Sequence, residues 1–115
     1  MENINMKYEK EFREFKEKLT DIYNSDKSTR IDLLHPYIME LRGFIRHSDL
    51  PHPNFEKIKN SYLDLFMENA KIIQGSHQLP ENKKESKFAD CYTNMISDLD
   101  EIKSKYLNIQ GEQSA

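Results

Sequence analysis

The segment ELRGFIRHSDLPHP, residues 40–53, holds the one local pattern in this sequence that suggests chemistry. It places Arg42 and His47 five positions apart, directly before a turn with two prolines. In a continuous helix five residues turn the chain by roughly 140° net, so these side chains point to different sides, whereas Arg42 and Arg46 share a face. The segment also suits a helix end, because cations are favoured near exposed C-terminal carbonyls. An active site and a basic helix end both stay open.

The LRGFIRH stretch, residues 41–47, resembles the LRNxxxH-type segment of the HEPN family, which are small helical-bundle ribonucleases of toxin–antitoxin and antiviral systems. The resemblance implies metal-independent RNA cleavage, in which Arg42 steadies phosphate charge and His47 moves a proton. In that family the site is usually completed across a dimer. Gly43 stands where the family usually has a polar residue. A ribonuclease that uses the Arg42–His47 pair is therefore one alternative function.

His35, in LLHPYIME, suggests a second alternative, a histidine phosphotransfer module. Such modules are also four-helix bundles of about this length, with a phosphorylatable histidine exposed in mid-helix. Pro36 follows directly and would distort the backbone around the histidine. The HxLKG-like signature of these modules is absent, because Pro36, Tyr37 and Ile38 follow His35. The structural alternative is a histidine at a helix kink whose ring partly covers the core.

Metal and cofactor sites are not expected. The histidines lack the i, i+4 pairing of helical zinc sites, and no Glu-x-x-His motif of di-iron bundles occurs. The three glycines are isolated, so no glycine-rich phosphate loop is present. Cys91 lies near an apolar stripe, where a free thiol usually serves packing. The histidines are His35, His47, His52 and His77.

Composition indicates a single-domain, all-α protein. The chain has 115 residues, enough for one domain, with 37% hydrophobic and 32% charged residues. It contains no valine, the most typical strand residue, so an all-α fold is expected. The net charge of −3 argues against a nucleic-acid partner, since nucleic-acid binders usually carry a basic surplus. A single cysteine, no apolar N-terminal segment and no run long enough for a membrane span predict a cytoplasmic protein.

Apolar residues at steps of three and four predict four helices, over about residues 4–24, 31–47, 55–75 and 88–109. Pro36 lies inside the second, where we expect a kink or a break. Short polar connections force neighbouring helices to run antiparallel, which predicts an up-down-up-down four-helix bundle. We expect one domain over residues 1–110 and a disordered tail over residues 111–115.

The third and fourth helices carry more apolar residues than one bundle position needs. The main apolar stripe of the third helix is formed by Phe55, Ile58, Tyr62, Leu65, Phe66, Ile72 and Ile73. Leu63, Met67 and Ala70 widen this apolar arc to roughly 220°. Apolar residues off the main stripe also occur on the fourth helix. Either these residues are buried beneath the loops, or they form a partner surface. The anchors expected for such a surface are Leu63, Met67, Ile96 and Leu107.

These observations favour a small non-catalytic helical protein that acts by protein–protein interaction. Regulatory proteins, adaptors, antitoxins, immunity proteins and inhibitors are built at this scale. A homodimer is the simplest use of a surplus apolar surface. No cofactor and no membrane contact are expected.

Overall fold

The structure, a computed structural model, describes the backbone of residues 2–48 and 53–114, and the side chains of residues 8–27, 29–48 and 53–106. Every regular element within this part of the chain is an α-helix. The elements are α1 (Glu2–Tyr23), α2 (Lys27–His47), α3 (Phe55–Ser76) and α4 (Glu81–Ser114). The all-α prediction is confirmed.

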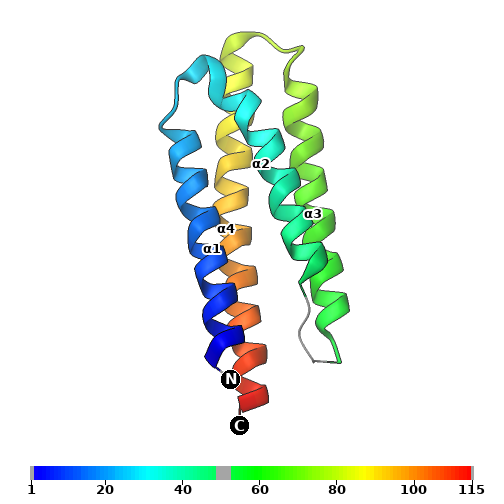
Figure 1. The fold of residues 1–115 in the computed structure, drawn as a ribbon. Coiled ribbons are helices and arrows are strands. Elements are labelled where there is room, and N and C mark those ends of the chain that lie inside the picture. The colour runs from blue at the N-terminus through cyan, green and yellow to red at the C-terminus, as the bar shows by residue number, and fades with distance from the viewer. Residues whose placement is uncertain (1, 49–52, 115) are drawn as a thin grey trace.

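The helices form an antiparallel up-down-up-down bundle (Figure 1). The contacts between α2 and α3 are the most extensive, and α4 packs between α1 and α3. Within the described residues, no Cα atom of α1 lies within 8 Å of one in α3, whereas α2 approaches α4 across the bundle. The longest dimension is 52 Å, about the length expected for a helix of 34 residues. The length of α4 therefore sets the length of the molecule.

Pro36 does not break α2. The helix runs without interruption from Lys27 to His47, and Pro36 is exposed. The carbonyl left without a partner by the missing N–H is that of Asp32, itself exposed, so water can reach it. One residue on, the Tyr37 hydroxyl donates a hydrogen bond of 2.7 Å to the Phe15 carbonyl of α1. This buried tie holds the helix in place beside the proline.

The fourth helix is longer at both ends than predicted. It begins at Glu81, and the backbone N–H groups of Lys83 and Lys84 donate to the Pro80 carbonyl, each at 2.9 Å. The prediction missed this turn because its residues are polar and therefore show no apolar periodicity. At the other end α4 continues through Gly111 to Ser114, the region predicted as a tail. No proline follows Gly111 to stop the helix.

An aromatic cluster fills the core where α1, α2 and α4 meet. The Phe12 ring lies edge-on to Phe44 at 5.6 Å and to Tyr106 at 5.2 Å between centroids. Tyr106 also contacts Tyr8 at 5.5 Å and Phe55 at 5.2 Å. Edge-to-face contacts of this kind place positive ring edges on negative ring faces. The periodic stripes of α1 and α4 thus predicted the core correctly.

The buried face of α3 differs from the predicted one. Leu65 and Ile72, placed on the core stripe by their spacing, are 37% and 42% exposed. Leu63 is 8% exposed and Ala70 1%, although both seemed surplus. The true buried face turns toward both α2 and α4 and includes polar residues that an apolar pattern skips. These polar residues are Lys59, Asn69 and Ser76.

Candidate functional site

Arg42 and His47 do not form a shared site in this structure. Arg42 is half-buried, and its Nε donates a hydrogen bond of 3.3 Å to the Leu63 carbonyl of α3. His47 is the last residue of α2 and is exposed. Because α2 is continuous between them, the two side chains leave the helix about 140° apart. Ribonuclease activity therefore stays a prediction. The arginine that it would need, Arg42, is hydrogen-bonded to α3.

The two other described histidines, His35 and His77, lie on different segments. His35 is half-buried in the middle of α2, and His77 follows α3 with its Nδ1 3.6 Å from Asp32 Oδ1. The position of His52 lies outside the described residues. Among described residues, no three His, Cys, Asp or Glu side chains are grouped to hold a metal ion.

Of the four anchors predicted for a partner surface, the three whose side chains are described do not gather on one face. Leu63 belongs to the core, and Met67, one turn later on the same side of α3, is half-buried. Ile96 lies one turn after Tyr92, whose ring packs at 4.6 Å on Tyr23 of α1, so it faces α1. The side chain of Leu107 lies outside the described ones. A common role for Leu63, Met67 and Ile96 would need two separate surfaces.

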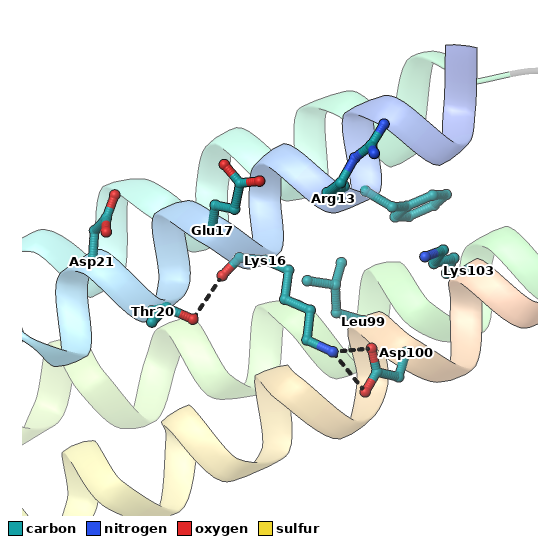
Figure 2. Close-up of a pocket in the computed structure, with 9 residues that line it drawn as sticks. Arg13, Lys16, Glu17, Thr20, Asp21, Leu99, Asp100 and Lys103 are labelled. Atoms are coloured by element: carbon teal, nitrogen blue, oxygen red, sulfur yellow. Dashed lines mark hydrogen bonds and ion pairs between the residues drawn. The ribbon is translucent and has the colours of Figure 1, made fainter. Parts of the chain in front are cut away.

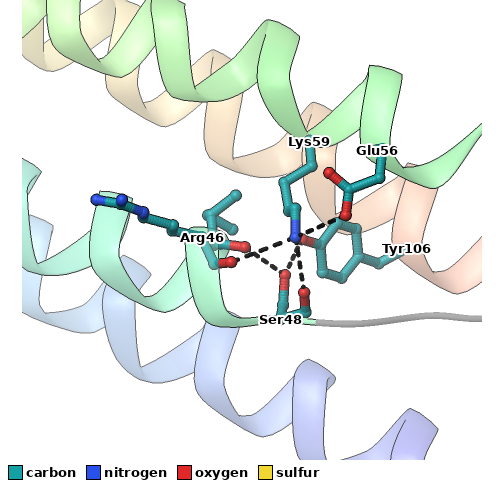
Figure 3. A network of polar contacts seen from close by, with 6 residues as sticks. Arg46, Ser48, Glu56, Lys59 and Tyr106 are labelled. Carbon is teal, nitrogen blue, oxygen red and sulfur yellow. Dashed lines mark hydrogen bonds and ion pairs between the residues drawn. The ribbon is translucent and has the colours of Figure 1, made fainter.

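A buried lysine closes the end of α2 (Figure 3). Lys59 of α3 is 8% exposed, and its Nζ donates to the carbonyls of Arg46 at 3.2 Å and Ser48 at 3.1 Å. Glu56 Oε1 lies 3.3 Å from the same ammonium. The Ser48 hydroxyl donates to the Ile45 carbonyl and is paired with the Tyr106 hydroxyl. The positive charge lies at the negative end of the helix dipole, which indicates a structural role.

A second polar layer joins α3 to α4. Asn69 donates from Nδ2 to the Leu65 carbonyl at 3.0 Å and accepts on Oδ1 from Asn94 at 3.2 Å. The Cys91 thiol donates to the Asn69 carbonyl at 3.7 Å. Burial, and to a smaller extent the neighbouring Asp90 carboxylate, raises the pKa of the Cys91 thiol to about 11. The thiol therefore stays protonated and weakly nucleophilic at neutral pH. Satisfied polar layers of this kind fix the register of two helices.

Asp98 makes the bundle sensitive to pH. Burial raises its pKa above the ordinary value, and the nearby Glu101 carboxylate raises it further. A raised folded-state pKa means that the folded chain holds the proton more tightly than the unfolded one. The stability from this group is therefore fully present below the unfolded pKa and is lost as pH rises through the folded pKa.

We therefore expect Asp98→Asn to unfold at a higher urea concentration than wild type at about pH 7, and the advantage to shrink as pH falls to about 4. Urea titrations followed by far-UV circular dichroism at several pH values measure this difference. An equal advantage at every pH would show that the substitution acts through packing and not through the charge.

An apolar stripe runs along the open side of α3, next to α4. It consists of Ile58, Leu65 and Ile72, spaced seven residues apart and called here the α3 stripe. Ile58 is half-buried, and the other two are among the most exposed large apolar side chains described. Ile58 and Leu65 line a groove of about 320 Å³ between α3 and α4. This groove combines accessible apolar surface with two exposed lysines, Lys57 and Lys105.

A larger groove of about 430 Å³ lies between α1 and α4 (Figure 2). Lys16 reaches across it to Asp100, with 3.1 Å between Nζ and Oδ1. Phe12 and Leu99 form its floor, but each is only 1% exposed. Charged side chains, among them Arg13, Glu17 and Lys103, line the groove around this floor, and exposed ion pairs contribute little energy.

Comparison of this chain with protein-family models, with curated proteins and with solved structures finds no match in any of the three. Each helix, as far as the structure describes it, is too short or too polar to span a bilayer. Any proposal about function therefore rests on the geometry of the chain itself.

Proposed function

We propose that this protein acts by binding another protein chain through the α3 stripe, and not by catalysis. The observation that supports this most directly is the exposure of Leu65 and Ile72, at 37% and 42%, seven residues apart on one helix face. Apolar side chains aligned over several helical turns beside a groove are suited to an apolar partner surface. A regulatory, adaptor, antitoxin, immunity or inhibitor protein in the cytoplasm fits this mode of action.

The ribonuclease alternative has weaker geometric support. The Arg42 guanidinium is engaged with the Leu63 carbonyl, whereas His47 is exposed at the end of α2. Phosphate stabilisation and proton transfer require both groups at one reacting phosphate. A ribonuclease would therefore need Arg42 released from α3 or a second chain to complete the site.

Site-specific cross-linking tests the proposal. A Leu65→Cys variant labelled with a benzophenone maleimide is irradiated in a concentrated lysate of the source cells. We expect one discrete adduct, because the label lies at the centre of the α3 stripe. The native thiol of Cys91 stays unlabelled in the folded protein, since it is buried and its pKa is raised to about 11.

The matched control is Leu33→Cys, because Leu33 is also a leucine on a helix, 44% exposed, but on α2. It should give no adduct of the same mass. Equal adducts from both positions, or none from position 65, would remove the α3 stripe as a binding surface. RNA cleavage without added metal that disappears in His47→Ala would instead support the ribonuclease.

A further inference from the structure

We infer that the partner of the α3 stripe is a second copy of this chain, with the two α3 helices antiparallel and Leu65 of one copy on Leu65 of the other. This inference rests on the proposed function, because it names the partner of the same surface. It is supported by the symmetry of the stripe, by the charges beside it and by the area of the face that α3 and α4 form.

The α3 stripe is symmetric about its centre. Ile58 and Ile72 each stand seven residues from Leu65, a distance of about 10.5 Å along the helix. Consider a two-fold axis at Leu65 that lies in the plane of the interface and is perpendicular to α3. This axis places Ile58 of each copy on Ile72 of the other. Coiled coils pair helices through apolar residues that repeat every 3.5 residues on average, and the α3 stripe supplies one of the two such positions in each seven. A two-fold dimer needs such a self-complementary patch.

The charge at one end of the stripe is positive. The Tyr62 hydroxyl donates to Glu101 Oε1 at 2.7 Å, which fixes how α4 lies beside α3. Lys105, one turn after Glu101, lines the same groove as Ile58. It is exposed and makes no ion pair within the described part of the chain. Its ammonium is therefore available to a carboxylate on the second copy.

An acidic side chain, Asp90, lies at the other end of the stripe. The hydrogen bond between Asn94 and Asn69 fixes the level of α4 there, at 3.2 Å. Asp90 lies one turn before Asn94, and Ile72 lies three residues after Asn69, so the antiparallel helices bring Asp90 level with Ile72. Asp90 is exposed and has no ion-pair partner among the described residues.

The antiparallel arrangement matches these charges. The two-fold axis exchanges the ends of the stripe while keeping α4 on the same side, so Lys105 of each copy meets Asp90 of the other. A parallel arrangement would set Lys105 against Lys57 of the second copy, two like charges. Along the helix direction, each Glu101 lies about three residues from the two-fold axis at Leu65. The two Glu101 carboxylates of the antiparallel dimer are therefore separated by about 9 Å in that direction. Charge thus favours the antiparallel orientation.

The face is large enough for a stable dimer. The 22 residues of α3 span about 33 Å. With α4 beside it, the face covers roughly 650 Å² per copy for helices about 10 Å wide. Two copies then bury about 1,300 Å², within the range of specific protein interfaces. The stripe alone would fall below that range, so α4 must take part in the contact.

Sedimentation velocity over about 1–200 µM tests the pairing on the full chain. Wild type should rise from one to two chain masses, and Leu65→Glu should stay monomeric, with its dissociation constant raised at least about 100-fold, because two carboxylates face each other at the axis. Leu33→Glu is the control and should behave as wild type. Because Leu65 is 37% exposed, both variants should keep the helical circular dichroism. A wild type that stays monomeric, or equal loss in both variants, would overturn the inference.

Charge reversal tests the orientation. Lys105→Glu should raise the dimer dissociation constant several-fold, and Lys105→Glu with Asp90→Lys should restore it. A double variant weaker than the single one would overturn the antiparallel pairing. The cross-link at position 65 separates this inference from the proposed function. An adduct of two chain masses supports both the proposed function and the self-pairing. An adduct with a different protein, together with a monomeric wild type, overturns only the self-pairing. The absence of any adduct overturns both.

Discussion

Replacing Phe12 by alanine is expected to lower the free energy of unfolding by about 3–5 kcal/mol, one of the two largest single effects in this chain. Phe12 is 1% exposed, and its ring lies edge-on to Phe44 of α2 and Tyr106 of α4. The substitution removes both ring contacts and leaves a cavity where three helices meet. Urea unfolding at 25 °C, followed by circular dichroism, measures the loss.

Phe12→Leu is the control, because it fills most of the cavity without the ring contacts and should lose less. Since small domains have only about 5–15 kcal/mol of stability, Phe12→Ala brings the bundle close to unfolding. A loss below about 1 kcal/mol would show that α1 does not pack on the core as described, because full burial of a phenylalanine contributes more than that.

Lys59→Met is expected to destabilise the protein by about 2–4 kcal/mol, although it replaces a charged residue in the interior by an apolar one of similar length. The buried ammonium satisfies the carbonyls of Arg46 and Ser48, and methionine can donate to neither. A buried acceptor without a donor costs about 1–3 kcal/mol. The ion pair with Glu56 adds little to the loss, since the Glu56 side chain is 73% exposed.

Lys57→Met is the matched control for this experiment. Lys57 lies two residues earlier on α3 and is exposed, so the same change should alter stability by no more than about 0.5 kcal/mol. Thermal and urea denaturation of both variants measure the difference. If Lys59→Met were as stable as wild type, the end of α2 would be closed by groups other than Lys59.

The candidate surface was only partly predictable. The sequence indicated surplus apolar residues on α3 and placed Leu65 on the main apolar stripe, but it left open whether Leu63 is buried or part of a partner surface. The structure buries Leu63 and exposes Leu65. Leu63 has apolar neighbours both three and four positions away, Phe66 and Met67, whereas Leu65 has only Tyr62, three positions away. Local spacing therefore favours Leu63 as the buried residue of the two. The seven-residue spacing of Ile58, Leu65 and Ile72 was present in the sequence. These three residues can be recognised as a separate stripe only once it is known that the main apolar face of α3 packs on α2 and α4.

The sequence by itself determined the four helices, their antiparallel order and the apolar cores of α1 and α4, because in these helices apolar and polar residues separate cleanly at helical spacing. Only the tertiary structure decided which face of α3 is buried. Lys59 and Asn69 lie in the interior because other helices supply their partners, the carbonyls at the end of α2 and the Asn94 side chain. Such partners come from residues distant in sequence, and no local pattern reveals them. Because Lys59 and Asn69 lie on the buried face of α3, the α3 stripe is left on the open side of the helix.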